Sequence, residues 1–307
     1  MIEICEVTKK YGDFTAIDKI SFKVENSSIV GLAGYNGAGK TTLLRVVAGV
    51  FRAQEGKVLL DGADAYDNDK ERKDLFYLAD DMWYAMSATG KSAAKYYSTY
   101  YPNFDMDVFL NICKIFGIDE KKRIRALSKG MTKQISIAIA FASKPKYLLI
   151  DETFDGLDPQ KKVLLKKIMA EYIQETKASV IITSHDLAEI SSICDYVILL
   201  NGKRVQLSCP IGEVSKNFRR VTASFKEDVT KNLFEGINYR SLKMDGKQAV
   251  IVVYGTIENE LKKLEEKGGT IKKAEELTLE EVFMEQLEEN EEEVANLFSK
   301  NKKKGTA

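Results

Sequence analysis

The nine residues GYNGAGKTT, from Gly34 to Thr42, constrain the fold of this chain more than any other stretch. They match the pattern GxxxxGK[ST] and follow the apolar run SSIVGLAG, which predicts a buried strand over residues 27–34. The helical pattern TLLRVVAGV follows directly. A strand, a glycine-rich turn and a helix in this order are typical of a phosphate-binding loop at a helix N-terminus.

Each part of this loop has a chemical reason. Gly37 and Gly39 allow backbone angles closed to other residues, so main-chain amides can converge on phosphate oxygens. Lys40 can reach the β- and γ-phosphates of a nucleotide, and the Thr41 hydroxyl can ligate Mg²⁺. The alternative, a glycine-rich turn with a surface lysine, leaves the flanking strand and helix unexplained. The loop residues predicted to contact the nucleotide are Asn36, Gly37, Ala38, Gly39, Lys40, Thr41 and Thr42.

Polar residues also end two further apolar runs. Asp151 ends KYLLID, and Glu152 follows it. The aspartate can hold Mg²⁺ through water, and the glutamate can orient or polarise an attacking water. His185, the only histidine, follows ASVIITS and can hydrogen-bond a γ-phosphate. The alternatives are two surface acids and a packing or capping histidine; the phosphate-binding loop in the same chain favours the functional interpretation.

The rest of the chain predicts four regions. Continuous apolar runs indicate a parallel sheet covered on both faces, and alternation over the first 30 residues indicates an antiparallel one. The aromatic-rich stretch from residue 81 to about 126 predicts a helical insert. Beyond about residue 215 we expect a strand, a hairpin around Asp245-Gly246, a helix and a capping box from Thr278 to Glu281. The expected domains are 1–215 with a helical subdomain at about 81–130, an α+β accessory domain at 216–290 and a charged tail at 291–307.

Composition narrows the class of partner. The 46 basic and 46 acidic residues give no net charge, which argues against a nucleic-acid binder that relies on bulk positive field. No signal peptide is evident, and no apolar run approaches the roughly 20 residues of a membrane span. The four cysteines have no CxxC pairing and are expected to be reduced packing residues. With a single histidine, a zinc site is not expected.

Tyr11, GYNGAGKTT, LSKGM, LLIDE, GLD and SH occur in this order over roughly residues 1–215, and the chain thereby resembles the ATP-binding cassette (ABC) ATPases, the engine subunits of ABC transporters. The resemblance implies an α/β fold: a RecA-like P-loop NTPase core with an antiparallel β-subdomain and a helical subdomain, plus the small C-terminal α+β domain. It implies ATP and Mg²⁺ as cofactors. Tyr11 would stack on adenine, Asp151 would be the Mg²⁺-associated acid, Glu152 the catalytic carboxylate and His185 the switch histidine.

The resemblance also implies partners. In ABC ATPases two cassettes pack head to tail, and the LSGGQ-type signature of one covers the ATP bound by the other. Ser128, Lys129 and Gly130 of the signature and Asp158 of the GLD loop would therefore act across a dimer with an identical or related second ATPase subunit. A separate transmembrane permease is implied, with the chain cytoplasmic and peripheral on the inner face of the cell membrane. Nucleic acid is not expected as a partner.

Three departures from the family pattern matter. Asp80, or in another register Asp81, stands where a glutamine is usual, and could approach Mg²⁺ or the attacking water. Lys129 replaces a signature glycine and Met131 a glutamine, as in a subset of ABC-2 exporter ATPases whose ending also resembles LTLEEVFMEQL. A lysine in the first turn opposes the helix dipole, so we expect Lys129 to face the partner's triphosphate or to lie near enough to interact with its charge. The alternatives are a soluble ABC ATPase acting on ribosomes or nucleic acid and a regulatory nucleotide-binding module.

Overall fold

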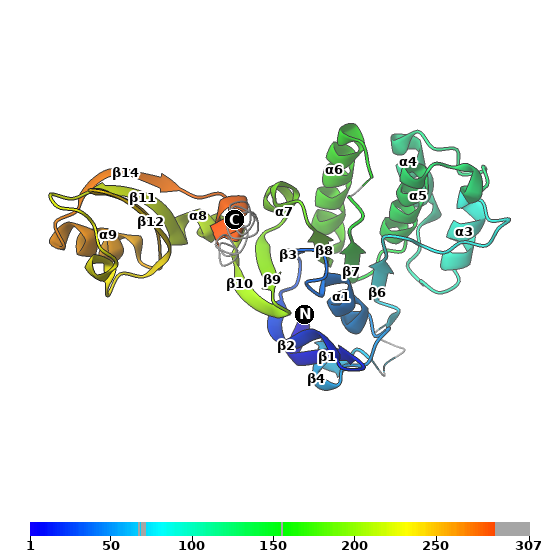
Figure 1. Ribbon diagram of the computed structural model, residues 1–307. Helices are drawn as coiled ribbons and strands as arrows, with labels where there is room; N and C mark the ends of the chain where they lie inside the picture. Colours follow the sequence, from blue (N-terminus) through cyan, green and yellow to red (C-terminus); the bar gives the residue numbers. More distant parts are fainter. Residues whose placement is uncertain (67, 69–71, 155, 286–307) are drawn as a thin grey trace, which may run out of the picture. The chain divides into compact units, whose positions relative to one another are not determined.

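The computed structural model describes residues 1–66, 68, 72–154 and 156–285, and it divides into two compact units (Figure 1). The first unit spans Met1–Cys209, and the second begins at Pro210. The predicted boundary at residue 215 lies within helix α8, Ile211–Asn217, which directly follows strand β10, Arg204–Pro210. The predicted tail at 291–307 lies outside the described residues.

An antiparallel sheet opens the first unit, as the alternating sequence predicts. Its strand order is β2-β1-β4-β5. Along β2, buried residues alternate with exposed ones, so one face packs inward and the other meets solvent. The strands are β1 (Ile2–Tyr11), β2 (Phe14–Val24), β4 (Glu55–Leu60) and β5 (Ala63–Asp64).

The second sheet of this unit positions the polar residues predicted from the sequence. Its order is β10-β9-β3-β8-β7-β6, and every residue of β7 and β8 is buried. Parallel pairing sets Asp151 beside Thr183 and Ala33 beside Ser184, so the carboxyl ends of β7, β8 and β3 meet at one edge. The strands are β3 (Ile29–Gly34), β6 (Leu75–Leu78), β7 (Tyr147–Asp151), β8 (Ser179–Ser184), β9 (Tyr196–Asn201) and β10 (Arg204–Pro210).

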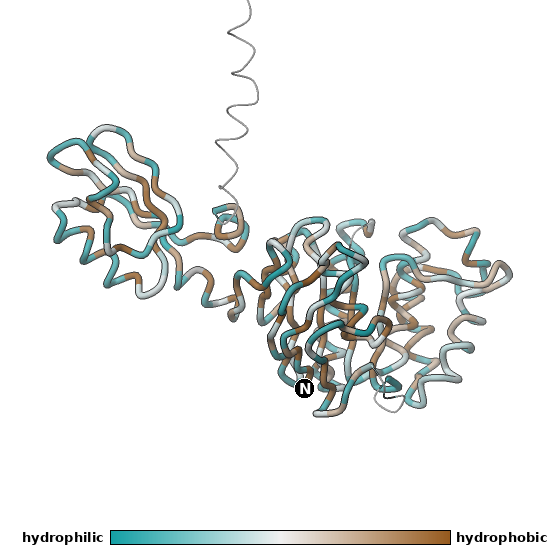
Figure 2. Tube along the Cα trace, turned by 60° about the horizontal axis from the view of Figure 1, so that its bottom comes forward, coloured by the Kyte–Doolittle hydropathy of each residue, from teal (hydrophilic) through white to brown (hydrophobic). Residues whose placement is uncertain are grey.

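Helix α1 (Lys40–Val47) lies between the two sheets, where its Leu43 and Leu44 share a core with residues of both. Helix α6 (Pro159–Thr176) connects β7 to β8, and α7 (Leu187–Ile193) packs against β3 and β8. In Figure 2 the hydrophobic colour gathers in the interior of the first unit, as expected for a buried core.

The predicted helical insert consists of α3 (Gly90–Tyr97), α4 (Met106–Phe116), the short 3₁₀ helix Ile124–Ala126 and α5 (Lys129–Ala142). Over residues 81–142 its only β pairing is an isolated bridge between Thr89 and Arg123. In the stretch YYSTYY, Tyr97 and Tyr101 pack against Phe76, whereas Tyr96 and Tyr100 are more than half exposed.

The second unit is an α+β fold with its own core around Val221, Phe234 and Ile251. Its antiparallel sheet has the order β12-β13-β11-β14, and the predicted hairpin turns at Asp245-Gly246. Thr278 and Glu281 form the predicted capping box at the start of α10. The elements after α8 are β11 (Phe218–Ser224), the 3₁₀ helix Lys231–Phe234, β12 (Tyr239–Asp245), β13 (Gln248–Tyr254), α9 (Ile257–Glu266), β14 (Thr270–Glu276) and α10 (Leu279–Glu285).

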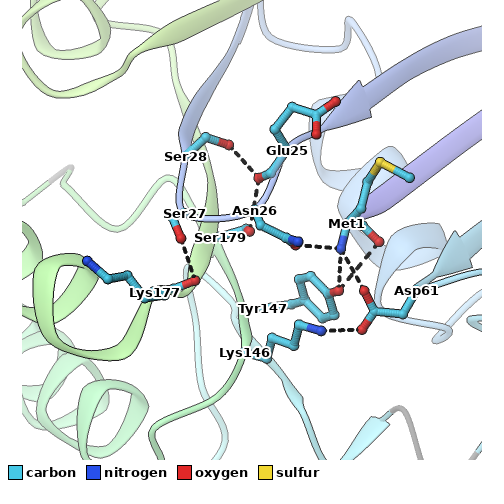
Figure 3. Close-up of polar contacts among 10 residues, drawn as sticks. All are labelled: Met1, Glu25, Asn26, Ser27, Ser28, Asp61, Lys146, Tyr147, Lys177 and Ser179. Carbon is cyan, nitrogen blue, oxygen red and sulfur yellow. Dashed lines mark hydrogen bonds and ion pairs between the residues drawn. The ribbon is translucent and has the colours of Figure 1, made fainter.

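The amino group of Met1 joins three elements of the first unit (Figure 3). It donates to Asn26 Oδ1 at 2.6 Å, Asp61 Oδ1 at 2.8 Å and the Tyr147 hydroxyl at 2.7 Å. Lys146 forms an ion pair with the same Asp61 carboxylate. Burial raises the pKa of Asp61, but hydrogen bonds from Lys146, the amino group and the tyrosine outweigh it and hold the pKa below its usual value. The start of β1, the turn after β4 and the start of β7 are thereby tied together.

Candidate functional site

The loop between β3 and α1 has the shape that its sequence predicts. Gly39 has φ +100°, and a Cβ there would lie 2.5 Å from Ile17 Cγ2 and 2.7 Å from the Ala16 carbonyl oxygen. Only glycine fits, because both the backbone conformation and the neighbouring strand exclude a side chain. The close approach packs the loop against β2 and leaves the N-terminus of α1 at the sheet edge.

Lys40 begins α1, and its side chain turns back into the loop. The residue is 4% exposed. Nζ donates to the carbonyl oxygens of Gly34 at 2.7 Å and Tyr35 at 3.1 Å, and lies 3.5 Å from Glu152 Oε1. A buried ammonium needs such partners. The lysine is thus held beside the carboxylate that the sequence predicts to be catalytic.

Asp151 is also buried, at 2% exposure, and accepts three hydrogen bonds from hydroxyl groups. Thr41 and Thr183 donate to Oδ1 at 3.1 and 2.8 Å, and Tyr77 donates to Oδ2 at 2.9 Å. Burial, followed by the charge of Asp151, raises the pKa of Tyr77, so this hydroxyl stays a donor. Thr41 and Asp151, both predicted to face Mg²⁺, are therefore in direct contact.

Glu152 adopts a left-handed backbone conformation with φ +46°. In a residue other than glycine this conformation costs roughly 1–3 kcal/mol and persists only where the surroundings enforce it. Its N–H donates to Thr183 Oγ1 at 3.0 Å, and its carbonyl oxygen accepts from Lys133 Nζ at 3.2 Å. Both main-chain groups are fixed by side chains from other elements.

A cavity of about 240 Å³ brings most of the predicted nucleotide-contacting residues together. Tyr11 lines it and is 44% exposed, with its ring edge-on to Phe51 at 5.9 Å between centroids. Phe14, 57% exposed, also lines the cavity and was not predicted; its signal would have been a second aromatic residue next to Tyr11. The predicted residues lining the cavity are Tyr11, Asn36, Gly37, Gly39, Lys40, Thr41, Thr42 and Glu152, whereas Ala38 is buried and does not line it.

The signature residues do not line this cavity. Ser128 caps α5, because its hydroxyl accepts from the Met131 N–H at 3.2 Å. Asp158 caps α6 by accepting from the Lys161 N–H at 3.0 Å. Lys129 is exposed, and a Cβ on Gly130 would lie 3.0 Å from the Gly156 carbonyl oxygen, so the signature and the GLD loop are neighbours.

His185 and Asp80 also lie outside the residues that line the cavity. His185 is exposed and directly follows β8. Asp80, just beyond β6, forms an ion pair with Lys133 of α5 and is 45% exposed; Asp81 is exposed. Sequence reasoning missed Lys133. The sequence feature that could have identified it is a single lysine in a helix segment that is otherwise buried and largely apolar.

A phosphate-binding loop on a parallel sheet, with Asp151 and Glu152 at the neighbouring strand end, defines a P-loop ATPase. The family model described as "ABC transporter" matches residues 17–155. The uncharacterised ABC transporter ATP-binding protein MJ1023 of Methanocaldococcus jannaschii is 33% identical, over 66% of this chain and 76% of its own. This chain therefore belongs to the ABC transporter ATP-binding protein family. It is the ATP-binding subunit of an ABC transporter, and an ATPase.

Other relatives agree with this assignment. YtrB of Bacillus subtilis is 28% identical over 75% of this chain and 78% of its own length. The Fe(3+) ion import protein FbpC 1 of Pectobacterium atrosepticum is 27% identical, over 76% of this chain and 67% of its own length. Two solved structures share the fold. One is an ATP-binding subunit of an ABC transporter, with a TM-score of 0.66 and 22% identity; the match covers 70% of this chain and 92% of that subunit. The other is the cassette MJ0796 as a dimer bound to ADP and Pi, with a TM-score of 0.62 and 20% identity; the match covers 68% of this chain and 98% of that cassette.

The described residues contain neither a membrane-spanning helix nor a cluster of metal-ligating side chains. Among them, no helix has both the length and the apolar character that crossing a membrane requires. The same part of the chain contains no cluster of three or more histidine, cysteine, aspartate or glutamate residues suited to a metal ion. All four cysteines are free thiols, and three of them are buried.

Proposed function

We propose that this subunit hydrolyses Mg-ATP at a site shared between two cassettes and thereby drives a separate transmembrane permease. One observation carries the proposal. Lys40, Thr41, Asp151 and Glu152 converge at the strand ends, whereas Ser128 and Lys129 lie elsewhere on the same unit. A second cassette is needed to bring a signature to the nucleotide. The MJ0796 structure, a dimer with ADP and Pi, supports this arrangement by analogy.

Each residue of the site has a separate role in binding or hydrolysing the nucleotide. Lys40 and the amides of Gly37 to Lys40 bind the β- and γ-phosphates, and Tyr11 stacks on the base. Glu152 orients and polarises the attacking water, and His185 contacts the γ-phosphate. The hydroxyl of Thr41 and the carboxylate of Asp151 are oxygen donors that fit Mg²⁺, which usually keeps several waters and phosphate ligands. When bound, the ion neutralises charge on the phosphates.

Replacing Glu152 by Gln tests the catalytic assignment. The amide keeps the shape of the side chain but cannot act as a base, so kcat of the basal ATPase should fall by about 100-fold or more. ATP binding should persist, because Lys40 and the loop amides are unchanged. Glu171→Gln, on the exposed face of α6, is the matched control and should keep the wild-type rate. Equal rates for wild type and Glu152→Gln would refute the assignment.

The helical insert offers the surface for the permease. A groove of about 550 Å³ between the β6–α3 segment and α5 is lined by Met82, Tyr84, Met86 and Leu127 among others. Trp83, beside the groove, is 84% exposed, and Met86, which lines it, is 76% exposed. Exposed large apolar side chains around a groove favour a protein partner. The inner face of the cell membrane, reached through that partner, is the proposed location.

Purifying the tagged chain from detergent-solubilised membranes and identifying the chains that accompany it tests the transporter proposal. An integral membrane protein should co-purify, and Trp83→Glu should weaken its recovery without altering basal ATPase. Recovery with ribosomes or nucleic acid, and no membrane partner, would favour the soluble ATPase instead. Export is the direction we propose, because of the SKGM signature and the terminal LTLEEVFMEQL. Because one relative is named as an iron-import protein, family membership does not favour export, and only these two sequence features support the proposed direction.

A further inference from the structure

Lys133 connects three parts of the first unit that are far apart in the sequence. It lies in the second turn of α5, with its side chain buried. Nζ forms an ion pair with Asp80, just past β6, and donates to the carbonyl oxygen of Glu152, just past β7, at 3.2 Å. One lysine thereby links the signature helix, the entry to the helical subdomain and the main chain of the proposed catalytic carboxylate.

The contact with Glu152 is one of two that hold its unusual backbone. The residue has φ +46°, a conformation that a side chain other than glycine keeps only under constraint. Thr183 accepts from its N–H, and Lys133 donates to its carbonyl oxygen. The direction of the side chain follows from the backbone. With both contacts in place, Glu152 Oε1 lies 3.5 Å from Lys40 Nζ.

We propose that Lys133 is a positioning residue for ATP hydrolysis, with Asp80 as its counter-ion. The inference rests on the proposed catalytic role of Glu152. A buried ammonium is stable only when it is paired, and Asp80 supplies the opposite charge from the partly exposed rim. Ser128 and Lys129 begin the same helix α5. A second cassette that docks at the N-terminus of α5 and shifts this helix also moves Lys133. The hydrogen bond from Lys133 to the carbonyl oxygen of Glu152 then changes.

Steady-state ATPase of the full chain tests the proposal with three variants. Lys133→Met removes the charge and the donor while keeping the length, and should lower kcat at least about tenfold with KM for ATP within about twofold. Lys133→Arg keeps a charged donor and should recover most of kcat. Lys122→Met, at an exposed lysine of the same insert, should match wild type. Unchanged kcat in Lys133→Met would overturn the proposal.

A double-mutant cycle separates positioning from a merely structural role. If Lys133 acts through Glu152, adding Lys133→Met to Glu152→Gln should lower kcat no further. Losses that multiply in the double variant would overturn the proposal. If Lys133→Met does not fold, Lys133→Gln enters the same cycle with the same expectation. The proposed function fails separately, when Glu152→Gln alone keeps the wild-type rate.

Asp80→Asn distinguishes a counter-ion from a metal ligand. As counter-ion of Lys133, Asp80 has no part in binding Mg²⁺, so the Mg²⁺ concentration for half-maximal ATPase should stay within about twofold of wild type while kcat falls. A rise of about tenfold or more in that concentration would place Asp80 at the metal and overturn its assignment as counter-ion.

Discussion

Tyr77 shows how a buried charge depends on single hydroxyl groups. The Tyr77 hydroxyl donates to Asp151 Oδ2 at 2.9 Å. Among the described residues, no other hydrogen bond reaches this oxygen. Both threonine hydroxyls, by contrast, bind Oδ1. A hydrogen bond to a charged, buried acceptor is worth about twice one to a neutral acceptor, because the unpaired charge is costly.

Tyr77→Phe should therefore lower the free energy of unfolding by about 1.5–3 kcal/mol. Tyr101→Phe is the matched control, because it removes a hydroxyl that donates to the neutral carbonyl of Leu75 at 3.1 Å. Its expected cost is about 0.5–1.5 kcal/mol. Urea denaturation of the full chain measures both values. Equal losses, or a larger loss in the Tyr101 variant, would contradict the importance given to the charge of Asp151.

The junction of β1, β4 and β7 makes a prediction about strands rather than single side chains. The Asp61 carboxylate connects these strands, because it forms ion pairs with the amino group of Met1 and with Lys146, the residue before β7. The pKa of Asp61 lies below its usual value. A carboxyl with a lowered folded-state pKa stabilises the fold fully above its unfolded-state pKa. That contribution is lost as the pH falls through the folded-state pKa.

Asp61→Asn should lower the free energy of unfolding by about 1 kcal/mol or less at pH 7, since the carboxylate is partly exposed and solvent screens it. The difference from wild type should persist down to about pH 4, the unfolded-state pKa, and then shrink. Urea midpoints at a series of pH values measure it. Asp13→Asn, in the exposed turn between β1 and β2, is the control. A difference that grows as the pH falls would contradict the direction of the shift.

At the same scale, local sequence patterns explain which elements were predictable. The strand, loop and helix around Lys40 are contiguous, and the apolar runs that form β7 and β8 are unbroken, so their order and polar ends follow from the sequence. The pairing of Asp80 with Lys133 spans the whole insert, and no pattern shows which cation meets that carboxylate. Strands β9 and β10 were not predicted, and the expected boundary at residue 215 lies within α8.

At the scale of the whole molecule, the separation of the cavity from the signature predicts that two defective chains can complement each other. Lys40→Ala damages the cavity and leaves the signature intact, and Ser128→Arg does the reverse. In a head-to-tail dimer of one of each, the intact cavity faces the intact signature, so one of the two sites is complete.

Mixing the two variants in equal amounts should therefore restore ATPase to about a quarter of wild type, since about half of the dimers are mixed and each has one complete site. Each variant alone should be nearly inactive. Lys40→Ala mixed with Glu152→Gln is the control, because both changes lie in the cavity of their own chain and no mixed dimer has a complete site. Recovery in the control, or none in the first mixture, would mean that the chains do not share sites in this way.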